Sequence, residues 1–285
     1  MSVVVTGATG HLGRLVVEEL LELGHPAEEI TAAGRRTDRL GPLADRGVAT
    51  TRVDFDDPAS LKAAFAGADA VLLVSGSELG RRVEQHRNAI EAAREAGVGH
   101  LVYTSAPRAT TTSLVLAPEH KATEEILAAS GLEHTILRNG WYHENYEQQL
   151  HQARETGAVV ASIGEGRVAS AARRDYAAAA AAVLRAPARH AGAVYELSGD
   201  TAWTLDDLAA AVGEALGREV VARNLTPEDH LAALLASGLD EDTARFVVAL
   251  DGNIRDGELA DTSGELAQLI GRPTTPLVEA LRALV

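Results

Sequence analysis

Three glycines spaced three residues apart, Gly7, Gly10 and Gly13, are the first residues suited to chemistry. They follow the apolar run Val3–Val5 and precede a helical repeat of apolar residues that ends before Gly24. In such a strand–turn–helix unit the glycines allow a tight turn, close approach of a pyrophosphate and close helix packing. The free amides of the helix attract phosphate. The spacing predicts a dinucleotide-binding turn; the alternative is a turn that binds nothing.

Two arginines, Arg35 and Arg36, follow the second predicted strand, Glu29–Ala33. An acidic residue in this place often binds the ribose 2′-hydroxyl of NAD. Guanidinium groups instead suit a 2′-phosphate, which they bind with charge-assisted hydrogen bonds. We therefore predict NADPH as the cofactor, against the alternative that both arginines are solvated surface residues.

Apolar strands and amphipathic helices alternate over roughly the first half of the chain, which predicts an α/β fold with a doubly wound parallel Rossmann sheet. Ligands of such sheets bind beyond the carboxyl ends of the strands. Asp54 is a candidate acceptor for the adenine amino group, or it only caps its turn. The predicted cofactor-binding residues are Thr6, Gly7, Thr9, Gly10, His11, Leu12, Gly13, Arg35, Arg36, Asp54, Phe55, Ser75, Gly76, Ser77, Thr104, Ser105, Asn139, Trp141 and Tyr142.

The second half is less regular. We predict an NADP(H)-binding domain over residues 1–138 and a smaller α/β substrate lobe over residues 139–285, partly interleaved with the first. A Gly164–Gly166 turn is expected to join strands Val159–Ser162 and Arg167–Ala171 as a hairpin. The acidic segment Asp240–Gly264 is a candidate mobile flap.

Composition restricts the partners. The net charge of −15 argues against nucleic acid and anionic membranes, because both require basic surface. The absence of cysteine excludes disulfides and thiolate chemistry, and no apolar run is long enough to span a membrane. We expect a cytoplasmic protein with a small-molecule partner. His86 is interpreted as a surface or interface residue of helix Arg82–Ala96, which is also a candidate homodimer surface.

Several common catalytic arrangements are missing. Lys121 lacks the tyrosine four residues earlier that many short-chain dehydrogenases use, because that position is Ala117. Tyr103 lacks the matching lysine, because that position is Pro107. There is also no His-Glu-x-x-His pattern and no nucleophile elbow, so we predict neither a metal site nor a hydrolase.

Four blocks together carry a family resemblance. They are Thr6-Gly7-Ala8-Thr9-Gly10-x-Leu12-Gly13, Glu119-His120-x-x-Thr123-Glu124, Leu137-Arg138-Asn139-Gly140-Trp141-Tyr142-x-Glu144-Asn145-Tyr146, and Val168-Ala169-Ser170 before Arg173-x-Asp175-Tyr176. The chain resembles the NmrA-like atypical short-chain dehydrogenase/reductases, and most of all their bacterial NADPH:quinone oxidoreductases of the second type and triphenylmethane reductases. The resemblance implies an NADPH-dependent reductase that transfers hydride to a quinone-like or other conjugated carbonyl or dye acceptor. Some relatives bind NADP(H) only as redox sensors, which is the alternative function.

Reduction of a quinone also requires a proton. His120 is our candidate catalytic donor, because it starts a helix facing the sheet edge and an ordinary imidazole titrates near pH ~6.5. The family resemblance supports this choice, because related benzylic ether reductases have a catalytic lysine at a similar position. Lys121 and Tyr142 are the further candidates, and the alternative for Tyr142 is a wall of an apolar pocket.

Overall fold

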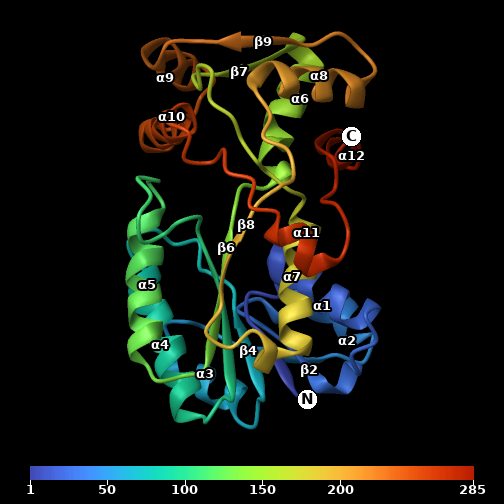
Figure 1. Cartoon of the computed structure of the whole chain (residues 1–285), viewed down its shortest axis with the longest axis vertical. Helices are drawn as coiled ribbons and strands as arrows, with labels where there is room; N and C mark the ends of the chain where they lie inside the picture. The colour runs from blue at the N-terminus through green and yellow to red at the C-terminus, as the bar shows by residue number, and fades with distance from the viewer. The chain divides into compact units, whose positions relative to one another are not determined.

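The computed structural model describes all 285 residues and divides into two compact units. Unit 1 comprises Met1–Thr110, Leu116–Asn139 and Arg173–Leu197. Unit 2 comprises Thr111–Val115, Gly140–Ala172 and Ser198–Val285. Figure 1 shows the course of the chain through the elements of each unit. None of the helices combines the length and the apolar character that a membrane crossing requires.

Unit 1 is built on a seven-stranded parallel sheet with the strand order β3-β2-β1-β4-β5-β6-β8. Its strands are β1 (Val3–Val5), β2 (Ile30–Gly34), β3 (Ala49–Arg52), β4 (Ala70–Leu73), β5 (His100–Ser105), β6 (His134–Asn139) and β8 (Val194–Leu197). The chain runs outward from β1 to β3 and then returns to β4, so the strand order reverses between β1 and β4. Such a reversal opens a crevice beyond the carboxyl ends of the two strands. The predicted doubly wound fold is confirmed.

Helices cover both faces of this sheet (Figure 1). Packed together on one face are α1 (His11–Glu22) and α7 (Arg173–Arg185). On the other face α4 (Arg82–Glu95) packs between α3 (Pro58–Phe65) and α5 (Ala117–Ala129). The short elements of the unit are α2 (Gly41–Ala44) and the 3-10 turns η1 (Ala27–Glu29), η2 (Thr37–Leu40) and η4 (Pro187–Arg189).

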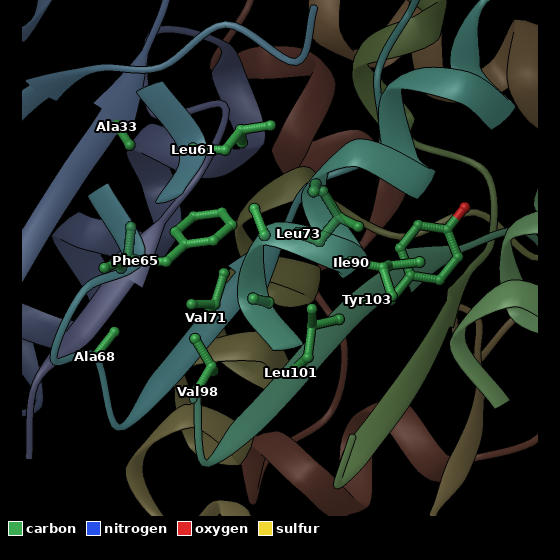
Figure 2. Close-up of a cluster of buried hydrophobic side chains, with 14 of the residues drawn as sticks. Ala33, Leu61, Phe65, Ala68, Val71, Leu73, Ile90, Val98, Leu101 and Tyr103 are labelled. Atoms are coloured by element: carbon green, nitrogen blue, oxygen red, sulfur yellow. The ribbon is translucent and has the colours of Figure 1, made fainter. Parts of the chain in front are cut away.

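One apolar cluster of unit 1 lies between the central strands of the sheet and helices α3, α4 and α5, and Figure 2 shows part of it. The cluster includes Phe65 from α3, Ile90 from α4, and Leu101 and Tyr103 from β5, and all four are fully buried. Burial of each such side chain stabilises the fold by roughly 1.5–3 kcal/mol. Tyr103 turns its hydroxyl away from the aliphatic side chains (Figure 2), so a polar partner must meet it there.

Unit 2 contains a two-stranded parallel sheet of β7 (Ala158–Ala161) and β9 (Val221–Asn224). Its helices are the 3-10 turn η3 (His143–Tyr146), α6 (Glu147–Thr156), α8 (Leu205–Leu216), α9 (Pro227–Ala236), α10 (Glu241–Arg255), α11 (Glu265–Ile270) and α12 (Leu277–Arg282). Both α6 and α8 pack on β7, and α9 packs on α10.

The predicted hairpin is wrong. Strand β7 pairs in parallel with β9, while residues 167–171 make only isolated bridges, Val168 with Trp203 and Ala171 with Tyr142. The Gly164–Gly166 turn instead packs on α10, where a Cβ on Gly166 would lie 2.5 Å from the carbonyl oxygen of Ile254. Most of the segment predicted as a flap is α10 itself, whose Asp251 accepts a 2.6 Å hydrogen bond from the amide of Ser162.

Candidate functional site

The turn between β1 and α1 has no room for side chains. Gly7 adopts φ +64°, and a Cβ on Gly13 would lie 2.5 Å from the Gly7 carbonyl oxygen, so α1 reaches this depth only with glycine there. Gly10 is the N-cap of α1, no side chain caps it, and the first helical turn carries no acidic residue. The amides at this helix end therefore offer the donors and positive potential that a phosphate requires.

The two threonines near Gly7, Thr6 and Thr9, differ in their surroundings. Thr6 is completely buried, and its hydroxyl donates to the Leu72 carbonyl (2.9 Å) and accepts from the Val74 amide (3.0 Å), which joins β1 to β4. Thr9 lies over Gly34 at the end of β2, where a Cβ would come within 2.6 Å of the threonine methyl group. In the first helical turn, His11 is exposed and Leu12 is buried.

Arg35 and Arg36 leave the end of β2 with side chains that are 57% and 60% exposed. An Arg35 guanidinium nitrogen lies 2.5 Å from a carboxylate oxygen of Glu78, in the loop between β4 and α4. Arg36 lies 3.8 Å from Asp38. Both cations are thus accessible at the edge of the sheet that carries the glycine turn, as a 2′-phosphate site requires.

Asp54 and Phe55 follow β3 and are half-buried. One Asp54 carboxylate oxygen accepts from the Asp56 amide (3.2 Å), and the other lies 3.2 Å from Arg52. Asp54 therefore does cap its turn. Phe55 packs against the apolar core and meets the ring of His86 edge-on, with ring centroids 6.1 Å apart.

The loop after β4 is held by buried polar side chains. The Ser75 amide donates to the Thr104 hydroxyl (2.9 Å), and the Gly76 amide donates to Nε2 of His86 (2.9 Å). Arg82 also holds this glycine, because its Nε donates to the Gly76 carbonyl at 2.7 Å. Ser77 is exposed. The segment Ser75–Ser77 thus lies at the carboxyl edge of the sheet, and hydrogen bonds with buried side chains fix its backbone.

His86 is completely buried, so its interpretation as a surface residue is wrong. Because Nε2 accepts from Gly76, the proton lies on Nδ1, which meets the Thr123 hydroxyl at 3.0 Å. Burial, with the nearby His120 and Arg82, lowers the pKa of His86 to about 3. The imidazole is therefore neutral at physiological pH, as its acceptor role demands.

His120 is also buried, and its Nδ1 lies 2.8 Å from the Tyr103 hydroxyl. This bond supplies the polar partner that Tyr103 needs at the border of the core. Burial and the Arg82 charge lower the pKa of His120 to about 3, and burial raises the pKa of Tyr103. Lys121, one residue further along α5, is exposed. At neutral pH His120 is thus an uncharged imidazole.

An ionic cluster spans the ends of β5, β6 and β8. Arg138 donates to both oxygens of Glu124 (3.0 and 2.6 Å) and to Glu196 (2.7 Å). Ser105 donates to Glu124 at 2.6 Å, and the Arg108 amide donates to Glu196 at 3.0 Å. The two carboxylates raise the pKa of Arg138, which stays charged. The cluster orients Ser105 away from solvent.

The remaining predicted residues follow β6. Asn139 ends β6 and is buried in unit 1. In unit 2, Trp141 and Tyr142 are half-buried, the Trp141 carbonyl accepts from the Ala171 amide (3.0 Å), and Tyr142 is the N-cap of η3.

Sequence reasoning missed the group that holds the β4–α4 loop. Besides His86, it comprises Arg82 and Glu119, whose carboxylate accepts from Arg82 and from the Gly80 amide, both at 2.8 Å. His86 and Arg82 lie four residues apart, so they share one face of α4. That spacing was the available signal, but polar residues on one face are usual at an exposed helix surface.

Comparisons with known proteins give one consistent result. A family model described as NAD(P)H-binding matches residues 7–187. Quinone oxidoreductase 2 of Escherichia coli is 45% identical over 99% of this chain and 98% of that protein. Among solved structures, the NADPH-dependent quinone oxidoreductase of Escherichia coli complexed with NADPH matches with a TM-score of 0.94 and 45% identity, over 99% of each chain. The Citrobacter sp. triphenylmethane reductase complexed with NADP(H) matches with a TM-score of 0.94 and 37% identity, over 100% of each chain.

Proposed function

Because the chain belongs to the NAD(P)H-binding family and its motifs are those of the NmrA-like reductases, we propose that it is an NADPH-dependent reductase. Its acceptors are quinones or related conjugated carbonyl compounds and dyes. The observation that carries the proposal is the glycine turn at the uncapped end of α1, where a Cβ on Gly13 would clash at 2.5 Å. The whole-length likeness to quinone and dye reductases supports this class of acceptor.

The residues of unit 1 fit the parts of NADPH. The amides of the glycine turn suit the pyrophosphate, and Arg35 with Arg36 suits the 2′-phosphate. Asp54 and Phe55 are the proposed adenine contacts, although one oxygen of Asp54 already caps its turn. The segment Ser75–Ser77 and Thr104, Ser105 and Asn139 continue the proposed site along the sheet edge of unit 1. Trp141 and Tyr142 belong to unit 2, and their part in cofactor binding stays a prediction. When bound, NADPH supplies the hydride.

The proton needs a separate source. The pKa of His120 is lowered to about 3, so the imidazolium form that would act as an acid is absent at physiological pH. We propose that the Tyr103 hydroxyl donates to Nδ1 and leaves the hydrogen on Nε2. A neutral imidazole in this state stabilises a developing oxyanion by hydrogen bonding and not by giving up its proton. Solvent is one proposed source of the proton, and Lys121 and Tyr142 are the proposed donors among the side chains.

The test mixes the protein with NADPH and a panel of quinones, conjugated ketones and triphenylmethane dyes, and follows the nicotinamide absorbance. We expect oxidation of NADPH with at least one quinone or dye, and a marked preference for NADPH over NADH. Tight binding of NADPH with no oxidation by any acceptor would instead favour the redox-sensor function. Absence of NADPH binding would contradict both.

A further inference from the structure

An ion pair joins the proposed 2′-phosphate site to a distant segment of unit 1. Arg35, at the end of β2, meets Glu78, in the loop between β4 and α4, 43 positions further along the sequence. The second carboxylate oxygen of Glu78 accepts from Nε2 of Gln85 at 3.2 Å. Arg35, and after it Gln85, lowers the pKa of Glu78 below its usual value. Glu78 is therefore an anion at neutral pH and neutralises one of the two proposed phosphate ligands.

The loop that carries Glu78 is fixed on both sides of it. Before Glu78, His86 and Arg82 hold the amide and carbonyl of Gly76. After it, the Gly80 amide donates to Glu119 at 2.8 Å. These anchors are mostly buried, whereas the Arg35 and Glu78 side chains are 57% and 34% exposed. The anchored loop thus holds the Glu78 carboxylate beside Arg35, and their exposed ion pair can open without moving the loop.

We propose that Glu78 is a specificity-determining residue that competes with the cofactor 2′-phosphate for Arg35. This inference rests on the proposed NADPH site. An exposed ion pair contributes little stability, so its rupture costs little. A phosphate monoester carries a charge of about −1.5 to −2 at pH 7 and three acceptor oxygens, so it displaces a single carboxylate. When the cofactor leaves, Glu78 returns to Arg35 and promotes dissociation.

Glu78→Gln tests this exchange. Glutamine keeps the shape of the side chain and an oxygen that accepts from Gln85, but it loses the charge. We expect NADPH and NADP⁺ to bind about threefold to tenfold more tightly, mainly because they dissociate more slowly. NAD(H) has no 2′-phosphate, so its affinity stays unchanged. Fluorescence titration gives the affinities, and stopped-flow displacement gives the dissociation rates.

Two controls separate the competition from other effects. Glu95, on α4, forms a different exposed ion pair, in which its carboxylate lies 3.2 Å from Lys62. Glu95→Gln removes that charge and leaves cofactor binding unchanged. In an Arg35→Ala background, Glu78→Gln has no further effect on NADP⁺ affinity if the competition acts through Arg35. An effect that persists there indicates direct repulsion of the phosphate and overturns the proposed exchange.

The remaining outcomes are equally decisive. Unchanged NADP⁺ affinity in a folded Glu78→Gln protein shows that Glu78 does not compete. Weaker binding shows that Glu78 orients Arg35 for the phosphate, which also overturns the proposal. Either result leaves the reductase function intact, because the wild-type protein still binds NADPH. A wild-type protein that binds no NADPH overturns the proposed function, and this inference with it.

Discussion

The β1–α1 turn and the β4–α4 loop follow neighbouring strands of one sheet, but they are stabilised in opposite ways. In the turn, Gly13 packs against the backbone of Gly7, and the helix end has no side-chain cap. In the loop, both polar backbone atoms of Gly76 bind side chains of α4, His86 and Arg82. The turn thus requires residues without a Cβ, whereas the loop requires specific buried hydrogen-bond partners.

This difference predicts different sensitivities. An added methyl group damages the turn, because a packed backbone cannot yield without moving α1. A lost hydrogen-bond partner damages the loop, because buried amides and carbonyls are costly to leave unpaired. The loop has a buried histidine, His86, among its partners and the turn has none, so acid acts more directly on the loop.

The largest expected effect is that of acid on the loop. His86 and His120 have pKa values of about 3 in the folded protein, below the unfolded value of 6.5. The unfolded chain therefore binds more protons below pH 6.5, and stability that is fully present above that pH is lost as the pH falls toward 3. Between pH 7 and pH 5 we expect the two histidines to lower the free energy of unfolding by about 4 kcal/mol.

Urea denaturation at both pH values measures this loss, and exchange of the Gly76 amide locates it. The Gly76 amide should lose protection at pH 5 before the Gly10 amide does. A pH-independent unfolding midpoint would show that neither histidine is held neutral by the fold.

The next largest effect is expected for His86→Leu. Leucine fills the buried space but leaves the Gly76 amide and the Thr123 hydroxyl without this partner. We expect a loss of about 3 kcal/mol of stability at pH 7 and a weaker dependence on acid. Thermal denaturation measures the loss. His151→Leu, at a side chain that is 53% exposed, is the matched control and should change stability little.

Gly13→Ala tests the turn. The added Cβ would lie 2.5 Å from the Gly7 carbonyl oxygen, so α1 must shift, at a cost of about 2 kcal/mol. We expect NADPH affinity to fall at least about tenfold, because the shift displaces the amides proposed to bind the pyrophosphate. Gly41→Ala is the control, since Gly41 has a helical φ of −46° and nothing within 4 Å of an added Cβ. Equal affinities in both variants would contradict the packing argument.

The smallest effect is expected for Arg36→Ala, beside the Arg35 that the β4–α4 loop engages. Arg36 is 60% exposed and lies 3.8 Å from Asp38, so its contact with a phosphate is screened by solvent. We expect about a threefold loss of NADPH affinity and no change for NADH. Isothermal titration measures both. Arg39→Ala, in the exposed η2 turn that follows Arg36, should leave both affinities unchanged. An equal loss for NADH would remove Arg36 from the proposed phosphate site.

Much of unit 1 could be predicted because its signals are local. The β-branched run Val3–Val5 with its glycines identifies a strand, a turn and a helix within a few residues. Asp57 before Pro58 predicts the start of α3, and the Asp57 carboxylate does accept from the Ala59 and Ser60 amides. The family motifs likewise predicted a reductase related to quinone and dye reductases, which the comparisons support.

Unit 2 was harder because its pairings are long-range. The alternating residues after Gly166 suited a strand, but the partner of β7 is β9, more than fifty residues away. The burial of His86 depended in the same way on Phe55, Tyr103 and Thr123, which surround it from other elements. Local patterns do not contain the competition among such distant partners.

The sequence alone determined where the glycine turn lies, which cations follow β2 and which catalytic motifs are absent, because these depend on residue type and short spacing. Only the tertiary structure decided the state of the polar residues beneath the sheet edge. It made His86 and His120 neutral by burial, placed Glu78 on Arg35, and tied the β4–α4 loop to α4 and α5. Charge and hydrogen bonding in a folded protein depend on desolvation and on neighbours that only the packed chain brings together.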